Sequence, residues 1–156
     1  MKETIRDVMT RDVETVAPDA TLQNAAQIMR SHDIGSVPVC ENRRVLGIVT
    51  DRDIAVRGVA EGRNAEAPVR EIMSTAVVSV REDSDLSDAE KLMHDRQLRR
   101  LPVVDSQGEL VGYLSLAKVA RTEGPKRAGR ILKGVSETAT PDPLAARKGK
   151  KRGKTG

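Results

Sequence analysis

The hydrophobic and turn-forming positions of the chain repeat after 64 residues. Residues 6–39 align with residues 70–103 at their apolar, proline and small positions. After one inserted residue, residues 46–50 align with residues 111–115. Dispersed matches of this kind are typical of one fold used twice. We therefore expect two copies of the same small unit.

Each copy shows the same succession of strand-like and helix-like hydrophobic patterns. A short β-prone run is followed by apolar residues at the spacing of an amphipathic helix. Two further β-prone runs around a polar turn predict a hairpin, and a second helix follows. Each copy therefore predicts a β-α-β-β-α unit. The expected strands are residues 13–16, 37–40 and 45–49 in the first copy and 77–80, 101–104 and 110–114 in the second, with helices beginning near Leu22, Asp51, Leu86 and Leu116.

This order places the chain in the α+β or α/β class, as two units that share one core. The first repeat is assigned residues 4–62 and the second residues 68–123. A weak amphipathic pattern predicts a short helix within residues 124–137. Residues 138–156 are rich in Lys, Arg, Gly and Pro and poor in apolar side chains, so we expect a disordered basic tail.

Composition restricts the core and the cellular location. The core must be aliphatic, because the chain has no Phe, no Trp and a single tyrosine, Tyr113. No stretch approaches the roughly 18 consecutive apolar residues of a membrane span. The charged N-terminus has no apolar run behind it, which argues against a signal peptide. With one cysteine, Cys40, there is no internal disulfide framework. We expect a cytoplasmic protein without a membrane partner.

The net charge of +4 arises at the C-terminal end. Residues 1–121 contain 17 Lys and Arg against 20 Asp and Glu, whereas residues 122–156 contain 10 against 3. The body is therefore slightly acidic. Nonspecific binding of nucleic acid, if it occurs, is expected to come from the basic tail.

Two sets of motifs resemble the CBS family, named after cystathionine β-synthase. The matching segments are residues 6–10, 34–39 and 46–54 in the first copy and residues 70–74, 98–105 and 110–115 in the second. Together they form a tandem pair, a Bateman module, that covers residues 4 to about 122. The resemblance implies two units related by pseudo-twofold symmetry and packed through their sheets. It also implies two symmetry-related clefts and a homodimer.

The resemblance further implies a regulatory function. The known ligands of the family are AMP, ADP, ATP, S-adenosylmethionine and NAD. Their binding changes the arrangement of the units or acts on a protein partner, here unknown, rather than leading to turnover. We therefore expect a module that is not an enzyme, needs no cofactor and takes an adenosine nucleotide as regulatory ligand. No Ser/His/Asp grouping, pair of acids or metal-ligand cluster occurs at a usable spacing.

The expected nucleotide site lies at the end of the third strand of the first copy. Residues 47–53, Gly-Ile-Val-Thr-Asp-Arg-Asp, match the family pattern Gly-apolar-apolar-Thr/Ser-x-x-Asp/Asn. The resemblance implies that Asp53 accepts hydrogen bonds from the ribose and that Thr50 donates to a phosphate. Backbone N–H groups at a helix start also favour phosphate. Ile48, Val37 and Pro38 are the expected apolar surface for adenine.

Thr50 and Asp53 also have an interpretation that needs no ligand. Thr-x-x-Asp at a helix start has the form of a capping box, with Thr50 as N-cap and Asp53 three residues later. One pair of side chains can serve both purposes. The sequence leaves both interpretations open.

Arg99 and Arg100 favour phosphate binding in the same cleft. They precede the strand that begins at Leu101, in the place where the first copy has Gly35 and Ser36. In one member of the family, a basic residue in the place of Arg100 reaches phosphates held by the neighbouring unit, and the forked donors of arginine suit that contact. The alternative is a solvated basic turn. Ser36, Arg99 and Arg100 complete the expected site.

The second copy departs from the pattern. Ser115 keeps the hydroxyl, but Leu116 replaces Asp51 and Lys118 replaces the acid. A lysine cannot accept hydrogen bonds from a ribose, and a cation near a helix start opposes the dipole. This second, weaker cleft is either empty or uses Lys118 for a phosphate. We expect unequal clefts.

Two other functions compete with nucleotide sensing. One is a structural dimerisation module whose clefts hold no ligand. The other is nonspecific nucleic-acid binding through the basic tail. Specific recognition of nucleic acid is disfavoured, because Tyr113 is the single side chain available for stacking on bases.

Overall fold

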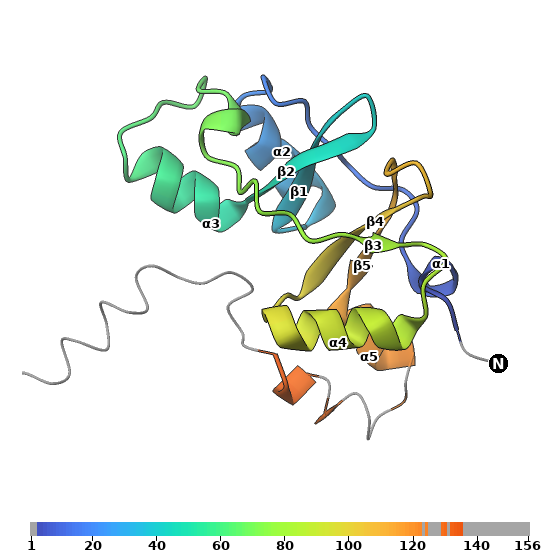
Figure 1. The fold of residues 1–156 in the computed structure, drawn as a ribbon. Helices are drawn as coiled ribbons and strands as arrows, with labels where there is room; N and C mark the ends of the chain where they lie inside the picture. Colours follow the sequence, from blue (N-terminus) through green and yellow to red (C-terminus); the bar gives the residue numbers. More distant parts are fainter. Residues whose placement is uncertain (1–2, 123, 125–128, 131, 136–156) are drawn as a thin grey trace, which may run out of the picture.

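The computed structural model describes residues 3–122, 124, 129–130 and 132–135, which form two repeated α+β units, each with a small sheet and its helices (Figure 1). The fold class and the repeated unit agree with the sequence analysis. The elements are α1 (Ile5–Val8), α2 (Leu22–His32), β1 (Ser36–Glu41), β2 (Arg44–Thr50), α3 (Asp51–Asp53), the π-helical η1 (Ile54–Val59), the 3-10 helix η2 (Val69–Glu71), β3 (Val80–Arg81), α4 (Leu86–Arg96), β4 (Arg100–Val104), β5 (Leu110–Ser115) and α5 (Leu116–Thr122).

The long helices α2 and α4 end in the same way. The residues after them, Asp33 and Gln97, have positive φ angles of 51° and 53° and adopt the left-handed conformation that stops a helix. At the start of α2, Thr21 accepts a hydrogen bond from the Asn24 backbone N–H at 3.0 Å. The two helices therefore end at the same point of the repeat.

Each sheet is built on an antiparallel hairpin. β1 pairs with β2 and β4 pairs with β5, both with an irregularity at the same point of the repeat, between Val39 and Cys40 and between Val103 and Val104. In the second unit the two-residue strand β3 adds to β4 in parallel.

The first expected strand of each repeat is shorter than predicted. Within the run of residues 13–16, only Val16 pairs with β1, through hydrogen bonds to Pro38 and Cys40. The chain turns directly afterwards, where the Ala20 N–H donates to the Ala17 carbonyl. The expected strand at residues 77–80 is likewise reduced to β3.

The leading segments of the two repeats are exchanged. The Ile5 N–H donates to the Ser84 carbonyl in the second unit, and the Val69 N–H donates to the Ala20 carbonyl in the first. These contacts match at the 64-residue offset. Further along, Thr10 exchanges two backbone hydrogen bonds with Tyr113. Ser74 does the same with Ile48.

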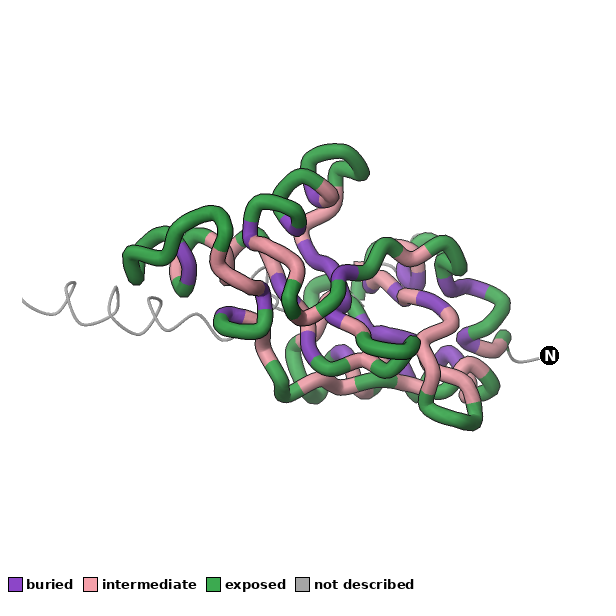
Figure 2. Tube along the Cα trace, turned by 90° about the horizontal axis from the view of Figure 1, so that it is seen from above, coloured by how far each residue is buried: buried purple, intermediate pink, exposed green. Residues whose placement is uncertain are grey.

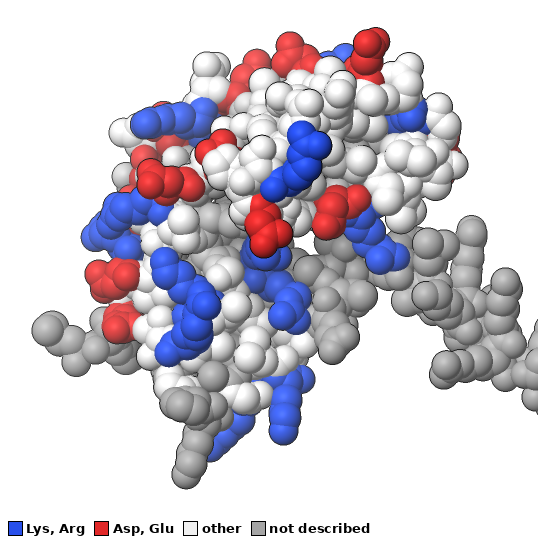
Figure 3. All heavy atoms as spheres, turned by 180° about the vertical axis from the view of Figure 1, so that it is seen from behind, with Lys and Arg blue, Asp and Glu red and all other residues white. Residues whose placement is uncertain are grey.

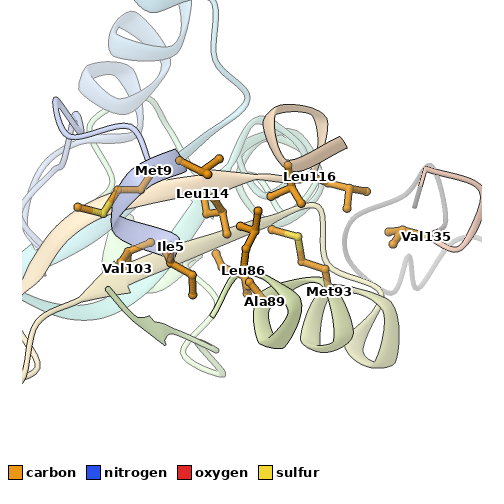
Figure 4. Close-up of a cluster of buried hydrophobic side chains, with 12 residues drawn as sticks. Ile5, Met9, Leu86, Ala89, Met93, Val103, Leu114, Leu116 and Val135 are labelled. Carbon is orange, nitrogen blue, oxygen red and sulfur yellow. The ribbon is translucent and has the colours of Figure 1, made fainter. Parts of the chain in front are cut away.

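The exchange gives two hydrophobic cores rather than the single shared core that we expected. Ile5, Val8 and Met9 lie in the core of the second unit with residues of α4, β4, β5 and α5 (Figure 4). Val69 and Ile72 lie in the core of the first unit with residues of α2, β1 and β2. Buried residues occur along the trace of both units in Figure 2. The units are held together because each fills part of its core with the other's leading segment.

The C-terminal part of the chain is described in fragments. Within the segment 124–137, for which a short helix is expected, residues 129, 130, 132 and 133 are helical. Val135 is 5% exposed and lies in the second core, and the Gln97 side chain donates to the Gly134 carbonyl at 3.0 Å. The expected disordered tail, residues 138–156, lies outside the described residues.

The exchanged segments cross the hairpins at two glycines, and this predicts a stability effect. A Cβ at Gly47 would lie 2.7 Å from the Ser74 carbonyl oxygen, and one at Gly112 would lie 2.5 Å from the Met9 sulfur. Gly47→Ala and Gly112→Ala should each lower the free energy of unfolding by about 1–3 kcal/mol, because such overpacking displaces neighbours. Urea denaturation measures the loss. Gly129→Ala is the matched control, since nothing lies within 4 Å of its Cβ position; an equal loss there would contradict the argument.

Candidate functional site

A cavity of about 380 Å³ lies between the two units. On the face of the molecule in Figure 3, acidic side chains of the upper, first unit lie close to basic side chains of the lower, second unit. The lining residues, here called the inter-unit cleft, are Gly35, Ser36, Ile48, Thr50, Asp51, Arg52, Asp53, Ser74, Ala76, Val77, Val78, Leu98, Arg99, Arg100 and Tyr113.

The first unit supplies the wall that contains Thr50 and Asp53. Thr50 is the last residue of β2 and the N-cap of α3. The Asp53 N–H donates to Thr50 Oγ1 at 3.0 Å, and the Thr50 N–H donates to Asp53 Oδ2 at 3.0 Å. This is the capping box that the sequence left as one of two interpretations. It occupies one carboxylate oxygen of Asp53 and the acceptor side of the Thr50 hydroxyl, so the Thr50 hydroxyl hydrogen and Asp53 Oδ1 remain available to the cleft.

Asp51 is held beside the cap. Its N–H donates to the Gly35 carbonyl at 3.0 Å, and its Oδ1 accepts from the Arg52 N–H at 2.8 Å. A Cβ at Gly35 would lie 3.3 Å from Asp51 Oδ2, which is tighter than an ordinary contact. A glycine at this position therefore leaves room for the Asp51 carboxylate at the cleft wall.

The second unit supplies the opposite, basic wall. Arg99 and Arg100 stand at the start of β4, with Arg99 partly buried and Arg100 exposed. The Arg99 carbonyl accepts from the Leu116 N–H at 2.8 Å, which fixes the backbone at this corner. Two guanidinium groups thus line the cavity that Asp51 and Asp53 line from the other side.

The apolar surface of the cleft includes a segment that comes from the exchange. Residues 74–78 follow the crossing at Gly47, so Ala76, Val77 and Val78 lie along the cavity with Ile48. Tyr113 completes this surface, and its hydroxyl lies 3.2 Å from the Ser36 hydroxyl across the two units. Burial raises the pKa of the Tyr113 phenol, opposed by the Ser36 hydrogen bond and by the positive charge of Arg100.

The structure brings most of the expected site residues together. Thr50, Asp53, Ile48, Ser36, Arg99 and Arg100 all line the inter-unit cleft. Val37 and Pro38 do not. Side chains alternate along a strand, so Val37 points into the first core, where it is fully buried. Pro38, which pairs with Ile48 in the β1–β2 register, is buried as well.

Sequence reasoning missed several lining residues. Gly35, Asp51 and Leu98 lie next to expected residues in the chain, so their neighbourhood was a usable signal. Ala76, Val77 and Val78 reach the cleft only through the exchange of segments, which no local pattern announces. One feature of the sequence could have drawn attention to Tyr113, namely that it is the single aromatic residue of the chain.

The corresponding place in the second repeat differs in its contacts. The Lys118 N–H donates to Ser115 Oγ at 3.2 Å, but a lysine side chain cannot return a hydrogen bond to the Ser115 N–H. Leu116, in the place of Asp51, is 1% exposed and lies in the second core. Neither Ser115 nor Lys118 lines any of the three main cavities found among the described residues.

Other chemistry is sparse in the described residues. No three His, Cys, Asp or Glu side chains there come together as a metal site requires. Cys40 is partly buried, and burial raises the pKa of its thiol to about 11, so little thiolate is present near neutral pH. No helix within the described ranges is long and apolar enough to span a bilayer.

Comparison with known proteins gives a consistent result. Residues 5–58 and 69–123 each match the CBS domain family model. The CBS domain-containing protein YhcV of Bacillus subtilis is 44% identical over 133 residues, which cover 85% of this chain and 94% of YhcV. Hypoxic response protein 1 of Mycobacterium tuberculosis is 36% identical over 145 residues, covering 92% and 99%.

Two solved structures share the fold. The crystal structure of Hypoxic Response Protein I with two coordinated zinc ions has a TM-score of 0.70 at 36% identity and covers 76% of this chain and 98% of that chain. The crystal structure of CBSX2 in complex with AMP has a TM-score of 0.68 at 26% identity and covers 77% and 95%. The zinc ions and the AMP belong to those proteins.

The capping box predicts a difference between variants at Asp53. Asp53→Ala should lower the free energy of unfolding by about 1 kcal/mol, because the hydrogen bond from the Thr50 N–H is lost. Asp53→Asn should lose less, since its amide oxygen can still accept that bond. Urea denaturation measures both. Lys118→Ala is the control in the second repeat, where no such bond exists; equal losses in all three would rule out the box as a stabilising contact.

Proposed function

The chain belongs to the CBS domain family, and on that basis we propose that it is a regulatory module that binds an adenosine-containing nucleotide in the inter-unit cleft. The observation that carries the proposal is the pairing of chemistries across one cavity. Asp53 offers a carboxylate oxygen that can accept hydrogen bonds from a ribose, and Arg99 and Arg100 face it from the other unit. CBSX2, with the same fold, is described in complex with AMP, which supports an adenine nucleotide.

The cleft favours a phosphorylated mononucleotide among the family's ligands. Its volume of about 380 Å³ lies near the lower end of the range for small-molecule sites, roughly 300–1,000 Å³, and so favours AMP or ADP over the larger NAD. Arg99 and Arg100 favour phosphate over the cationic sulfonium of S-adenosylmethionine, because guanidinium groups bind oxyanions with charge-assisted hydrogen bonds.

A ligand in this position would connect the two units. The ribose would contact the first unit at Asp53, and the phosphate would contact the second at Arg100. Binding would therefore stabilise one relative arrangement of the units, which a homodimer or a protein partner can sense. This is a regulatory output that needs neither a catalytic group nor a required cofactor. A structural dimerisation module is the competing function, and it predicts no ligand.

The proposed ribose contact gives one prediction for ligand binding. Asp53→Asn should weaken AMP binding about tenfold or more in a calorimetric titration, because the amide nitrogen then facing the cleft cannot accept a hydrogen bond from the ribose. The capping bond is retained in this variant, so its folding is preserved. Lys118→Ala, at the equivalent position of the second repeat, should leave AMP affinity unchanged. Wild-type affinity in a folded Asp53→Asn protein would place the ligand elsewhere.

A second prediction concerns the phosphate contact. Arg100→Ala should weaken AMP and ADP binding about tenfold but leave adenosine binding nearly unchanged, because the guanidinium acts on phosphate alone. Arg96→Ala is the matched control, since Arg96 ends α4 and does not line the cleft. Equal losses for AMP and adenosine would contradict this assignment. Failure of the wild-type protein to bind any nucleotide would favour the dimerisation module.

A further inference from the structure

The Ser36 and Tyr113 hydroxyls form a polar pair at the boundary of the two units. They lie 3.2 Å apart, and either one can be the donor. Ser36 is 9% exposed, and both residues line the inter-unit cleft. The expected site included Ser36 for its position in the repeat, but no part was assigned to Tyr113.

The pair has one hydrogen-bond donor more than it uses. Each hydroxyl carries one hydrogen, and the bond between them takes one of the two. No other hydrogen bond to either hydroxyl is formed within the described part of the chain. A donor in a largely buried place is costly to leave unpaired. An acceptor in the cleft would satisfy it.

The neighbours of the pair show where in the cleft this donor lies. Ser36 is directly opposite Thr50 in the β1–β2 register, so their side chains share one face of the hairpin about 5 Å apart. Arg100 is the diagonal neighbour of Tyr113, because Tyr113 pairs with Pro102 and Arg100 lies two residues earlier on β4. The spare donor therefore lies between Thr50, to which the family resemblance assigns a phosphate contact, and Arg100, to which the proposed function assigns one.

We propose that Tyr113, held in place by Ser36, donates its hydroxyl hydrogen to a phosphate oxygen of the ligand and makes the cleft specific for a phosphorylated nucleotide. The inference rests on the proposed function and adds a specificity-determining residue to it. Phosphate oxygens only accept hydrogen bonds, so they match a group with a surplus donor. The hydrogen bond between Ser36 and Tyr113 also connects this phosphate contact to the first unit.

Tyr113, rather than Ser36, is the donor to phosphate in this arrangement. A phenol is more acidic than an aliphatic hydroxyl and is therefore the stronger donor. When Ser36 donates to Tyr113, the two hydrogen bonds point in the same direction and polarise each other. The positive charge of Arg100 also strengthens the Tyr113 hydroxyl as a donor, because it stabilises negative charge on the Tyr113 oxygen.

Binding measurements on three variants test this assignment. Tyr113→Phe keeps the ring and removes the hydroxyl, and it should weaken AMP binding about tenfold while leaving adenosine binding unchanged. Ser36→Ala should cause a smaller loss for AMP, because Tyr113 keeps its donor. Ser31→Ala, which removes an exposed hydroxyl of α2 outside the cleft, should leave AMP binding unchanged. Thermal unfolding checks that each variant folds.

A spectroscopic readout is available because Tyr113 is the only tyrosine. With ring-13C-labelled tyrosine, the protein gives the NMR signals of a single ring. AMP should shift the ring carbon that bears the hydroxyl, and Ser36→Ala should alter that shift. Adenosine should shift the same carbon much less.

Four results would overturn the inference. They are an unchanged AMP affinity in Tyr113→Phe, equal losses for AMP and adenosine, a larger loss in Ser36→Ala than in Tyr113→Phe, and an unmoved Tyr113 signal on binding of AMP. If the wild-type protein binds no nucleotide, the proposed function fails, and pyrophosphate then tests the anion contact by itself. A Tyr113 shift with pyrophosphate, absent with sodium chloride at the same ionic strength, would support the contact, and its absence would exclude it.

Discussion

Each unit completes its core with the leading segment of the other repeat, and this exchange depends on two backbone crossings where no side chain fits. Gly47 and Gly112 are the crossing points, in contact with Met73 and Ser74 and with Met9 and Thr10. Separating the units would expose Ile5, Val8, Val69 and Ile72, which are almost fully buried. Burying such side chains stabilises by about 1.5–3 kcal/mol each, so the relative position of the units is strongly constrained.

The cleft is a consequence of that constraint. Once Ser74 pairs with Ile48, the following residues must run across the end of β2, and they close the cavity over Thr50 and Asp53. The capping box then fixes these two side chains without using all of their polar atoms. Helix capping and the proposed ligand contacts are therefore compatible, because each would use a different atom of the same residue.

Departures from the repeat make the two halves chemically unequal. Ser36 stands where the second repeat has Arg100, Ile48 where it has Tyr113, and Asp53 where it has Lys118. Through the pseudo-twofold arrangement, the arginines and the tyrosine of the second repeat line the cleft of the first. The cavity therefore combines an acidic wall and a basic wall that neither repeat possesses by itself.

The sequence by itself determined the repeat, the order of the elements, the hairpins and the place of Thr50 and Asp53 at a helix start. These follow from short-range periodicity and spacing, which the local chain sets. Tertiary structure decided that the leading segments are exchanged, that two cores form, that Val37 faces a core and that Tyr113 reaches Ser36. Those outcomes depend on contacts between residues about 25 to 80 positions apart, such as the pair of Ser36 and Tyr113. Burial and close packing choose such contacts only when the whole chain has folded, so no local pattern contains them.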